Sequence, residues 1–158
     1  MRYDFLIETY ETERIKVISA WSMFTDHDLS VRPNASDTRG RSLHEHMVHQ
    51  CVSEDIWFRT MLDIDVGAPP LPKEEVRLEF MRRYEEDSEK RLAVLRTKDE
   101  AWWEGETTFF DVQRSRAWVM TRRMTHIPPI IVGSNWPCYE CSVGNSTAIM
   151  VQPPIRAV

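Results

Sequence analysis

Apolar residues recur every three or four positions over four stretches of the chain, and this spacing predicts four amphipathic helices. The first stretch, residues 3–24, carries Tyr3, Ile7, Tyr10, Val17, Trp21 and Phe24. The second, residues 42–62, carries Leu43, Met47, Cys51, Phe58 and Met61. The third, residues 73–97, carries Val76, Phe80, Tyr84, Leu92 and Leu95, and the fourth, residues 112–126, carries Ala117, Met120 and Met124. Four such helices predict an all-α protein, an up-down four-helix bundle.

Polar residues predict where these helices begin and end. Ser42 and Glu45 have the spacing of a capping box, in which each side chain bonds to the backbone amide of the other residue. Pro72 and the acidic residues after it suit the start of the third helix, and Asp111 suits the cap of the fourth. The Pro128-Pro129 pair predicts that the fourth helix ends at residue 126.

The connections divide the chain into a bundle and a tail. Residues 25–41 and 63–72 are rich in turn formers and read as loops, whereas residues 99–111 are aromatic and are expected to pack over one end of the bundle. Residues 127–158 contain five prolines and show neither helical nor strand periodicity. We therefore expect one domain over residues 1–126, followed by a tail over residues 127–158 that forms no independent domain and leaves the C-terminal segment truncated or irregular.

Charge and composition narrow the function. The net charge of −5 and the lack of a basic run argue against nucleic-acid binding. The N-terminal residues do not resemble a signal peptide, and no segment has the length and apolar character of a membrane span. Three cysteines are an odd number and fit reduced thiols, so we expect a cytoplasmic protein.

Four histidines are the main chemical candidates. His44, His46 and His49 lie within two turns of the second predicted helix, and His126 ends the fourth. Imidazoles that converge from different helices of a bundle can hold a divalent metal, and three ligands with an open position make a catalytic site. By helical angle His46 lies nearer to the buried stripe than His49 does, while His44 lies on the other flank. The alternative is that these histidines are solvated and have no such role.

Other polar groups carry weaker signals. Glu54 lies on the apolar face of the second predicted helix, so its carboxylate needs a partner. The group Arg116, Arg122 and Arg123 suits an anionic substrate, or else is a solvated helix face. The Cys138-x-x-Cys141 pair has redox or zinc spacing but no second pair to complete a zinc site.

The stretch from Ser42 to Gln50, then Glu54 with Trp57-Phe58, and the helix from Arg116 to His126 together resemble the DinB family of DinB/YfiT-like metalloenzymes. The resemblance covers roughly residues 3–126. It implies a four-helix bundle, often a homodimer, with nickel or zinc held by one histidine of the second helix and a His-x-x-x-His pair of the fourth. It assigns the metal ligands to His49 and His126, with His46 as the runner-up.

The chain departs from the family after His126. Ile130 stands where the family has its third ligand, so the site is incomplete unless water, Glu54 or another chain supplies a donor. Codons for residues 126–137, read from the last base of the His126 codon, permit His-Thr-Ala-His-His-Arg-Gly-Gln-Gln-Leu-Ala, which contains the family motif. We interpret residues 127–158 as a frameshifted product, and sequencing of the gene tests this interpretation.

The resemblance also implies a function. Relatives transfer low-molecular-weight thiols or isomerise thiol adducts, so we expect a divalent-metal-binding enzyme such as a thiol S-transferase or a related hydrolase or isomerase. Its partners would be a small-molecule substrate and a second copy of the chain, with no role for nucleic acid or membrane. The alternative is a metal-free helical protein that dimerises or binds a ligand without catalysis.

Overall fold

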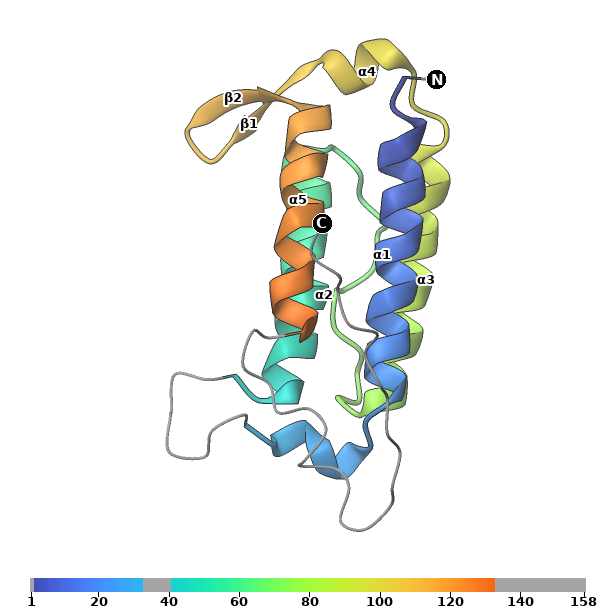
Figure 1. Cartoon of the computed structure of the whole chain (residues 1–158), viewed down its shortest axis with the longest axis vertical. Helices are drawn as coiled ribbons and strands as arrows, with labels where there is room; N and C mark the ends of the chain where they lie inside the picture. The colour runs from blue at the N-terminus through green and yellow to red at the C-terminus, as the bar shows by residue number, and fades with distance from the viewer. Residues whose placement is uncertain (1, 33–40, 133–158) are drawn as a thin grey trace, which may run out of the picture.

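The computed structural model describes residues 2–32 and 41–132, and for residues 126–132 it describes the backbone alone. Within these residues the chain is mostly helical, with one small two-stranded sheet. The helices α1 (Asp4–Ser22), α2 (Leu43–Met61), α3 (Arg77–Leu95) and α5 (Arg116–Val132) are the long elements (Figure 1). The all-α expectation is therefore confirmed at the level of helical content.

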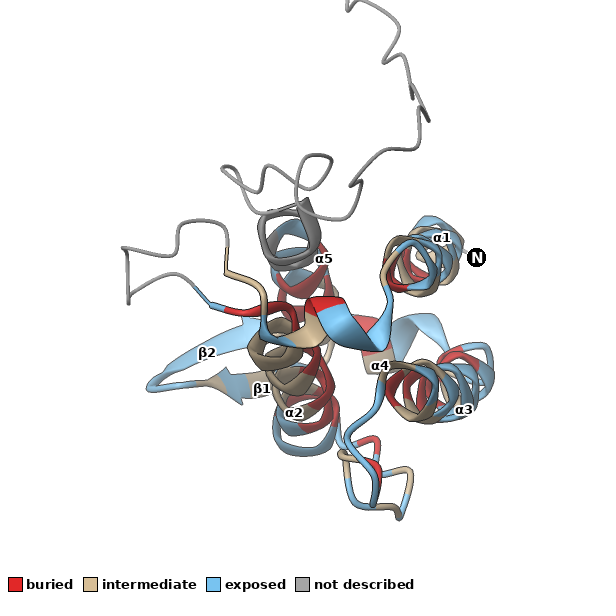
Figure 2. Ribbon diagram, turned by 90° about the horizontal axis from the view of Figure 1, so that it is seen from below, coloured by how far each residue is buried: buried red, intermediate tan, exposed pale blue. Residues whose placement is uncertain are grey.

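The long helices lie side by side, and their buried residues face one another (Figures 1 and 2). α1 packs against α3 and α5, and α2 packs against α5 and α3. Two apolar clusters fill the space between them. One includes Tyr10, Phe58 and Trp103, and the other includes Val17, Met47 and Phe80.

α2 begins where the capping box predicts. The amide of Glu45 donates to Ser42 Oγ at 3.2 Å, and the amide of Ser42 donates to Glu45 Oε2 at 2.7 Å. The predicted loop before α2 includes a short 3-10 helix, Asp26–Ser30, which begins with a second capping box between Thr25 and Asp28. Residues 33–40 of that loop lie outside the described residues.

α3 begins at Arg77, four residues later than the sequence predicts, and ends at Leu95. The reason is a cap from a distant part of the chain. Asp26 Oδ1 accepts a hydrogen bond from the Arg77 amide at 2.8 Å and so satisfies one of the free amides of the first turn. The spacing of residues around Arg77 cannot predict a cap from Asp26, which lies far away in the sequence.

The aromatic stretch before the last helix has regular structure. It contains the short helix α4 (Glu100–Glu104) and a hairpin of β1 (Glu106–Phe109) and β2 (Val112–Ser115), which pair antiparallel with Phe109 opposite Val112. Trp103 of α4 is fully buried at one end of the long helices. The expectation that this stretch packs over one end is confirmed for α4.

The predicted bounds of the last helix are wrong at both ends. Residues 112–115 form β2, and Ser115 rather than Asp111 caps α5, because Ser115 Oγ accepts from the Trp118 amide at 3.2 Å. At the other end α5 continues through Pro128-Pro129 to Val132 instead of ending at residue 126. Proline has a helical φ angle, but beyond the first turn of a helix it lacks the amide donor and its ring crowds the carbonyl four residues before it, which is why the sequence pattern predicts a break here. Residues 133–158, including Cys138 and Cys141, lie outside the described residues.

Candidate functional site

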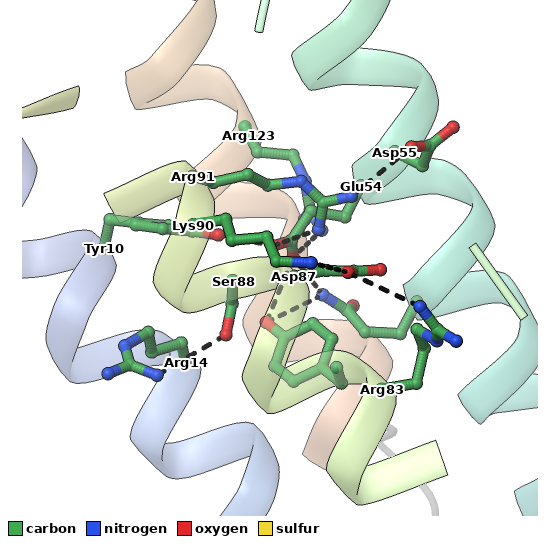
Figure 3. Close-up of polar contacts among 12 residues, drawn as sticks. Tyr10, Arg14, Glu54, Asp55, Arg83, Asp87, Ser88, Lys90, Arg91 and Arg123 are labelled. Atoms are coloured by element: carbon green, nitrogen blue, oxygen red, sulfur yellow. Dashed lines mark hydrogen bonds and ion pairs between the residues drawn. The ribbon is translucent and has the colours of Figure 1, made fainter. Parts of the chain in front are cut away.

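The carboxylate of Glu54 lies in the centre of the described helices and is fully buried (Figure 3). It accepts hydrogen bonds from Tyr10 Oη of α1 at 2.6 Å, from Tyr84 Oη of α3 at 3.0 Å and from Gln50 Nε2 of α2 at 2.8 Å. The prediction that this carboxylate has a partner is confirmed.

Two buried arginines neutralise Glu54. Arg123 Nη2 of α5 lies 2.9 Å from Glu54 Oε2, and Arg91 Nη1 of α3 lies 3.4 Å from Glu54 Oε1. The side chains of Glu54 and Arg123 are 0% exposed and that of Arg91 is 2% exposed. Charges so far from water persist only when they are paired. Glu54 therefore joins residues of all four long helices at one point.

The charged cluster extends from Glu54 toward the surface. Arg91 Nη2 lies 3.4 Å from Asp55 Oδ1, and Asp55 Oδ2 lies 3.3 Å from Arg59, whose side chain is exposed. Asp87 lies 3.9 Å from both Arg83 and Lys90 (Figure 3). Burial raises the pKa of the Asp87 carboxyl, although neighbouring cations oppose the shift.

The tyrosines of the cluster remain hydrogen-bond donors at neutral pH. Burial raises the pKa of both Tyr10 and Tyr84, and the neighbouring Glu54 raises it further. A phenol that donates to a carboxylate lowers the cost of burying that carboxylate. Arg91 Nε, Arg123 Nε and Arg123 Nη1 are buried without a hydrogen-bond partner among the described residues. Because Glu54 and both arginines are nevertheless ion-paired and shielded from water, this cluster is suited to hold the helices together rather than to act on a substrate.

His44 has a structural partner. Its Nε2 lies 2.5 Å from Glu75 Oε2, and its ring is 5.6 Å from the Phe80 ring in an edge-on arrangement. His44 therefore joins α2 to the segment before α3 and to α3 itself.

His46 and His49 are both half-buried on α2. Burial lowers the pKa of His46, and Arg41 lowers it further, so its imidazole is neutral at pH 7. His49 lines a shallow groove of about 310 Å³ on the outer side of α2, together with His44, Glu45, Val48 and Val52. The buried row of α2 instead contains Met47, Gln50 and Glu54.

The ion pair between Glu54 and Arg123 gives the levels of the predicted ligands. His49 lies five residues before Glu54, or about 7.5 Å along α2, and His126 lies three residues after Arg123, or about 4.5 Å along α5. α2 and α5 run in opposite directions (Figure 1), so both histidines lie on the same side of the ion pair. Counted along each helix from its own member of the ion pair, these two distances differ by about 3 Å.

The orientation around α2 favours His46 instead. The Trp57 ring lies 5.3 Å from that of Phe109 in β1, and the Phe109 ring lies 5.0 Å from that of Trp118 in α5. Trp57 therefore marks the flank of α2 that faces α5. At about 100° per residue, His46 lies within about 20° of Trp57 around the helix axis and His49 about 80° away. Position along the helices thus favours His49 as the α2 ligand, whereas direction around the axis of α2 favours His46.

Among the residues whose side chains are described, no group of three or more histidine, cysteine or acidic residues could hold a metal ion. The side chain of His126 lies outside those residues, as does that of Ile130. Of the two predicted ligands, His126 is therefore described only by its backbone position in α5. Glu54 is fully engaged by the two arginines and the two tyrosines, so it does not serve as the missing donor.

The sequence did not reveal the role of the arginines. We placed Arg123 with Arg116 and Arg122 as a substrate-binding group or a solvated face, whereas Arg123 is fully buried. Its position between Met120 and Met124, on the apolar stripe of the last helix, is the signal that identifies it. Arg116 donates instead to the carbonyl of Trp102 at 3.3 Å.

Among the described residues, no helix combines the length and the apolar character needed to cross a bilayer. No protein-family model, curated protein or solved structure shows a significant match to the chain.

Proposed function

We propose that the chain is an up-down four-helix bundle of the DinB type that binds a divalent metal ion, nickel or zinc, between α2 and α5. The ligands are His49 and His126, with His46 as the runner-up on α2. The observation that supports the proposal is the buried ion pair between Glu54 and Arg123, because it joins α2 to α5, the two helices that carry the candidate histidines.

Histidine nitrogens are suitable donors for such an ion, but two histidines are one fewer than a three-histidine site requires. Histidines on two packed helices provide nitrogen donors on a rigid frame, and the pKa of His46 is already lowered, which keeps that imidazole neutral as a ligand must be. Two imidazoles leave the coordination shell open to water or substrate. We therefore expect weak binding.

The proposed activity is a metal-dependent reaction of a small molecule such as a low-molecular-weight thiol, as in a thiol S-transferase or a related hydrolase or isomerase. A bound divalent ion supplies a lowered pKa for a coordinated thiol or water. The chain's own part is to hold the two histidine-bearing helices together.

A second proposal is a metal-free helical protein that acts by dimerisation or ligand binding. It is supported by apolar side chains left on the surface at the hairpin and the start of α5. Phe110 is 72% exposed, and Val112 and Trp118 are also exposed. A homodimer that covers this surface is compatible with either function.

Elemental analysis of the purified full chain tests the metal-binding proposal. We expect nickel or zinc in the wild type and a clear loss in both His49→Ala and His126→Ala. His27→Ala is the matched control, because His27 is exposed on the 3-10 helix before α2 and should retain the metal.

Absence of metal from the wild type after loading with nickel or zinc contradicts the proposal, as does equal retention by all three variants. Loss in His46→Ala with retention in His49→Ala would instead assign the α2 ligand to His46.

A further inference from the structure

The outer face of α2 carries a row of partly exposed apolar side chains. Val48, Val52 and Ile56 follow one another at intervals of four residues, and the first two are half-buried while Ile56 is 42% exposed. The buried residues of α2 lie instead on the side toward the other long helices (Figure 2). We propose that a second copy of the chain packs along this row in the antiparallel direction, with Val52 of each copy on the two-fold axis.

Two grooves follow this row and meet at Val52. One, of about 310 Å³, is lined by α2 alone and includes Val48 and Val52. The other, of about 430 Å³, lies between Val52 and Ile56 of α2 and Pro69-Pro70 of the following loop. Val48 and Ile56 are each four residues from Val52, so in a two-fold antiparallel pair the partner's Ile56 reaches the level of Val48, and the partner's Val48 that of Ile56. Each groove therefore faces an apolar side chain of the second copy.

The charges on this face are also complementary to themselves. Glu45 and Arg59 are each seven residues from Val52, in opposite directions along α2 and within about 20° of Val52 around its axis. In the two-fold pair Glu45 comes to the level of the partner's Arg59, and this contact occurs twice. Their side chains are 44% and 53% exposed, so each has room for a further partner beside Arg32 and Asp55 of its own chain.

Other arrangements of the two helices bring like charges together. Parallel copies of α2 would place Glu45 beside Glu45 and Arg59 beside Arg59. A slide of the antiparallel pair by one turn would place Glu45 beside Asp55 in one direction and beside Asp63 in the other. Apolar burial supplies the attraction, whereas the opposite charges specify direction and register. A second copy is the occupant that this pattern specifies, because one helix face supplies both the grooves and the groups that fit them.

Sedimentation velocity of the purified full chain over a range of concentrations tests the inference, and we expect a reversible dimer. Val52→Glu and Val52→Lys should each weaken the dimer by about tenfold or more, because each places like charges together on the two-fold axis. An equal mixture of the two variants should recover the dimer, since opposite charges then meet there. Phe110→Glu is the control for the exposed side chains at the hairpin and should leave the dimer intact.

Arg59→Glu gives a second test if a variant at position 52 loses its helical signal in circular dichroism. It places like charges together at both contacts with the partner's Glu45, so association should weaken by about tenfold. Arg82→Glu is the matched control, because Arg82 of α3 is 58% exposed and its substitution changes the net charge equally. Its association should stay within about twofold of the wild type.

A wild type that is monomeric at every concentration overturns the inference. Wild-type association in either folded variant at position 52, or a mixture that recovers no dimer, also overturns it. Loss of the dimer in Phe110→Glu would place the interface at the hairpin instead, and equal losses in Arg59→Glu and Arg82→Glu would reduce the effect to general charge repulsion. The inference needs no bound metal, so each of these outcomes leaves the metal-binding proposal standing.

Discussion

The residue on which the described structure most depends is Glu54. Its carboxylate is fully buried and contacts groups from all four long helices. A buried carboxylate with two arginines does not add much stability compared with a well-packed apolar cluster, but loss of one charge is costly. Glu54 therefore specifies how the helices pack more than it adds to their stability.

Replacement of Glu54 by glutamine should lower the free energy of unfolding by about 3–5 kcal/mol, because Arg91 and Arg123 would lose their shared counter-charge in the interior. Urea unfolding measures this loss. Glu11→Gln is the control, since Glu11 makes a surface ion pair with Arg96 at 3.0 Å and should change stability by less than about 1 kcal/mol. Equal losses in both variants would show that the buried pair has no special role.

Because Asp87 has a raised pKa in the folded state, we expect the free energy of unfolding to depend on pH. Burial raises its folded-state pKa above the ordinary value of 3.8, so the folded state binds its proton more tightly than the unfolded state does. Stability from this group is therefore present at low pH and is lost as the pH rises through the raised pKa. Relative to the wild type, Asp87→Asn should gain stability between about pH 4 and pH 6. Urea unfolding at both pH values measures the difference, and a relative loss would indicate a lowered pKa instead.

At the scale of elements, the sequence predicted the bounds of those helices that depend on neighbouring residues alone. The capping box at Ser42 and the apolar stripes of α1 and α2 placed these helices to within two residues at each end. The start of α3 was missed because Asp26 caps it from a distant segment, and β2 was missed because its partner strand competes with helix over residues 112–115. These partners exist only in the folded chain.

The sequence likewise predicted only part of the candidate site. The need of Glu54 for a partner followed from an acid on an apolar stripe, but the identity of the partners did not. Arg91 and Arg123 come from α3 and α5, and pairing across helices has no signature in the spacing of either helix. The sequence supplied candidate histidines, and the fold gave His44 a different role beside Glu75.

The continuation of α5 through Val132 makes a gain-of-function test possible. Positions 126 and 130 of a helix lie on one face, so Ile130→His would give α5 a histidine pair of the His-x-x-x-His type. With a third imidazole, Ni²⁺ affinity should rise by about tenfold or more. Ile131→His is the control, because position 131 is rotated by about 100° from position 130. An equal rise in both variants would indicate adventitious binding.

At the scale of the whole molecule, the four long helices meet at one buried carboxylate, and the metal site that we propose uses histidines of two of these helices, α2 and α5. The central claim is that the contact between α2 and α5 presents His49 and His126 to one ion. Diffraction from crystals of the full chain soaked in Ni²⁺, measured at the nickel absorption edge, tests it most directly. The account predicts an anomalous peak about 2.0–2.1 Å from an imidazole nitrogen of each of these residues. A fully occupied ion elsewhere, or no peak at this contact, would contradict it.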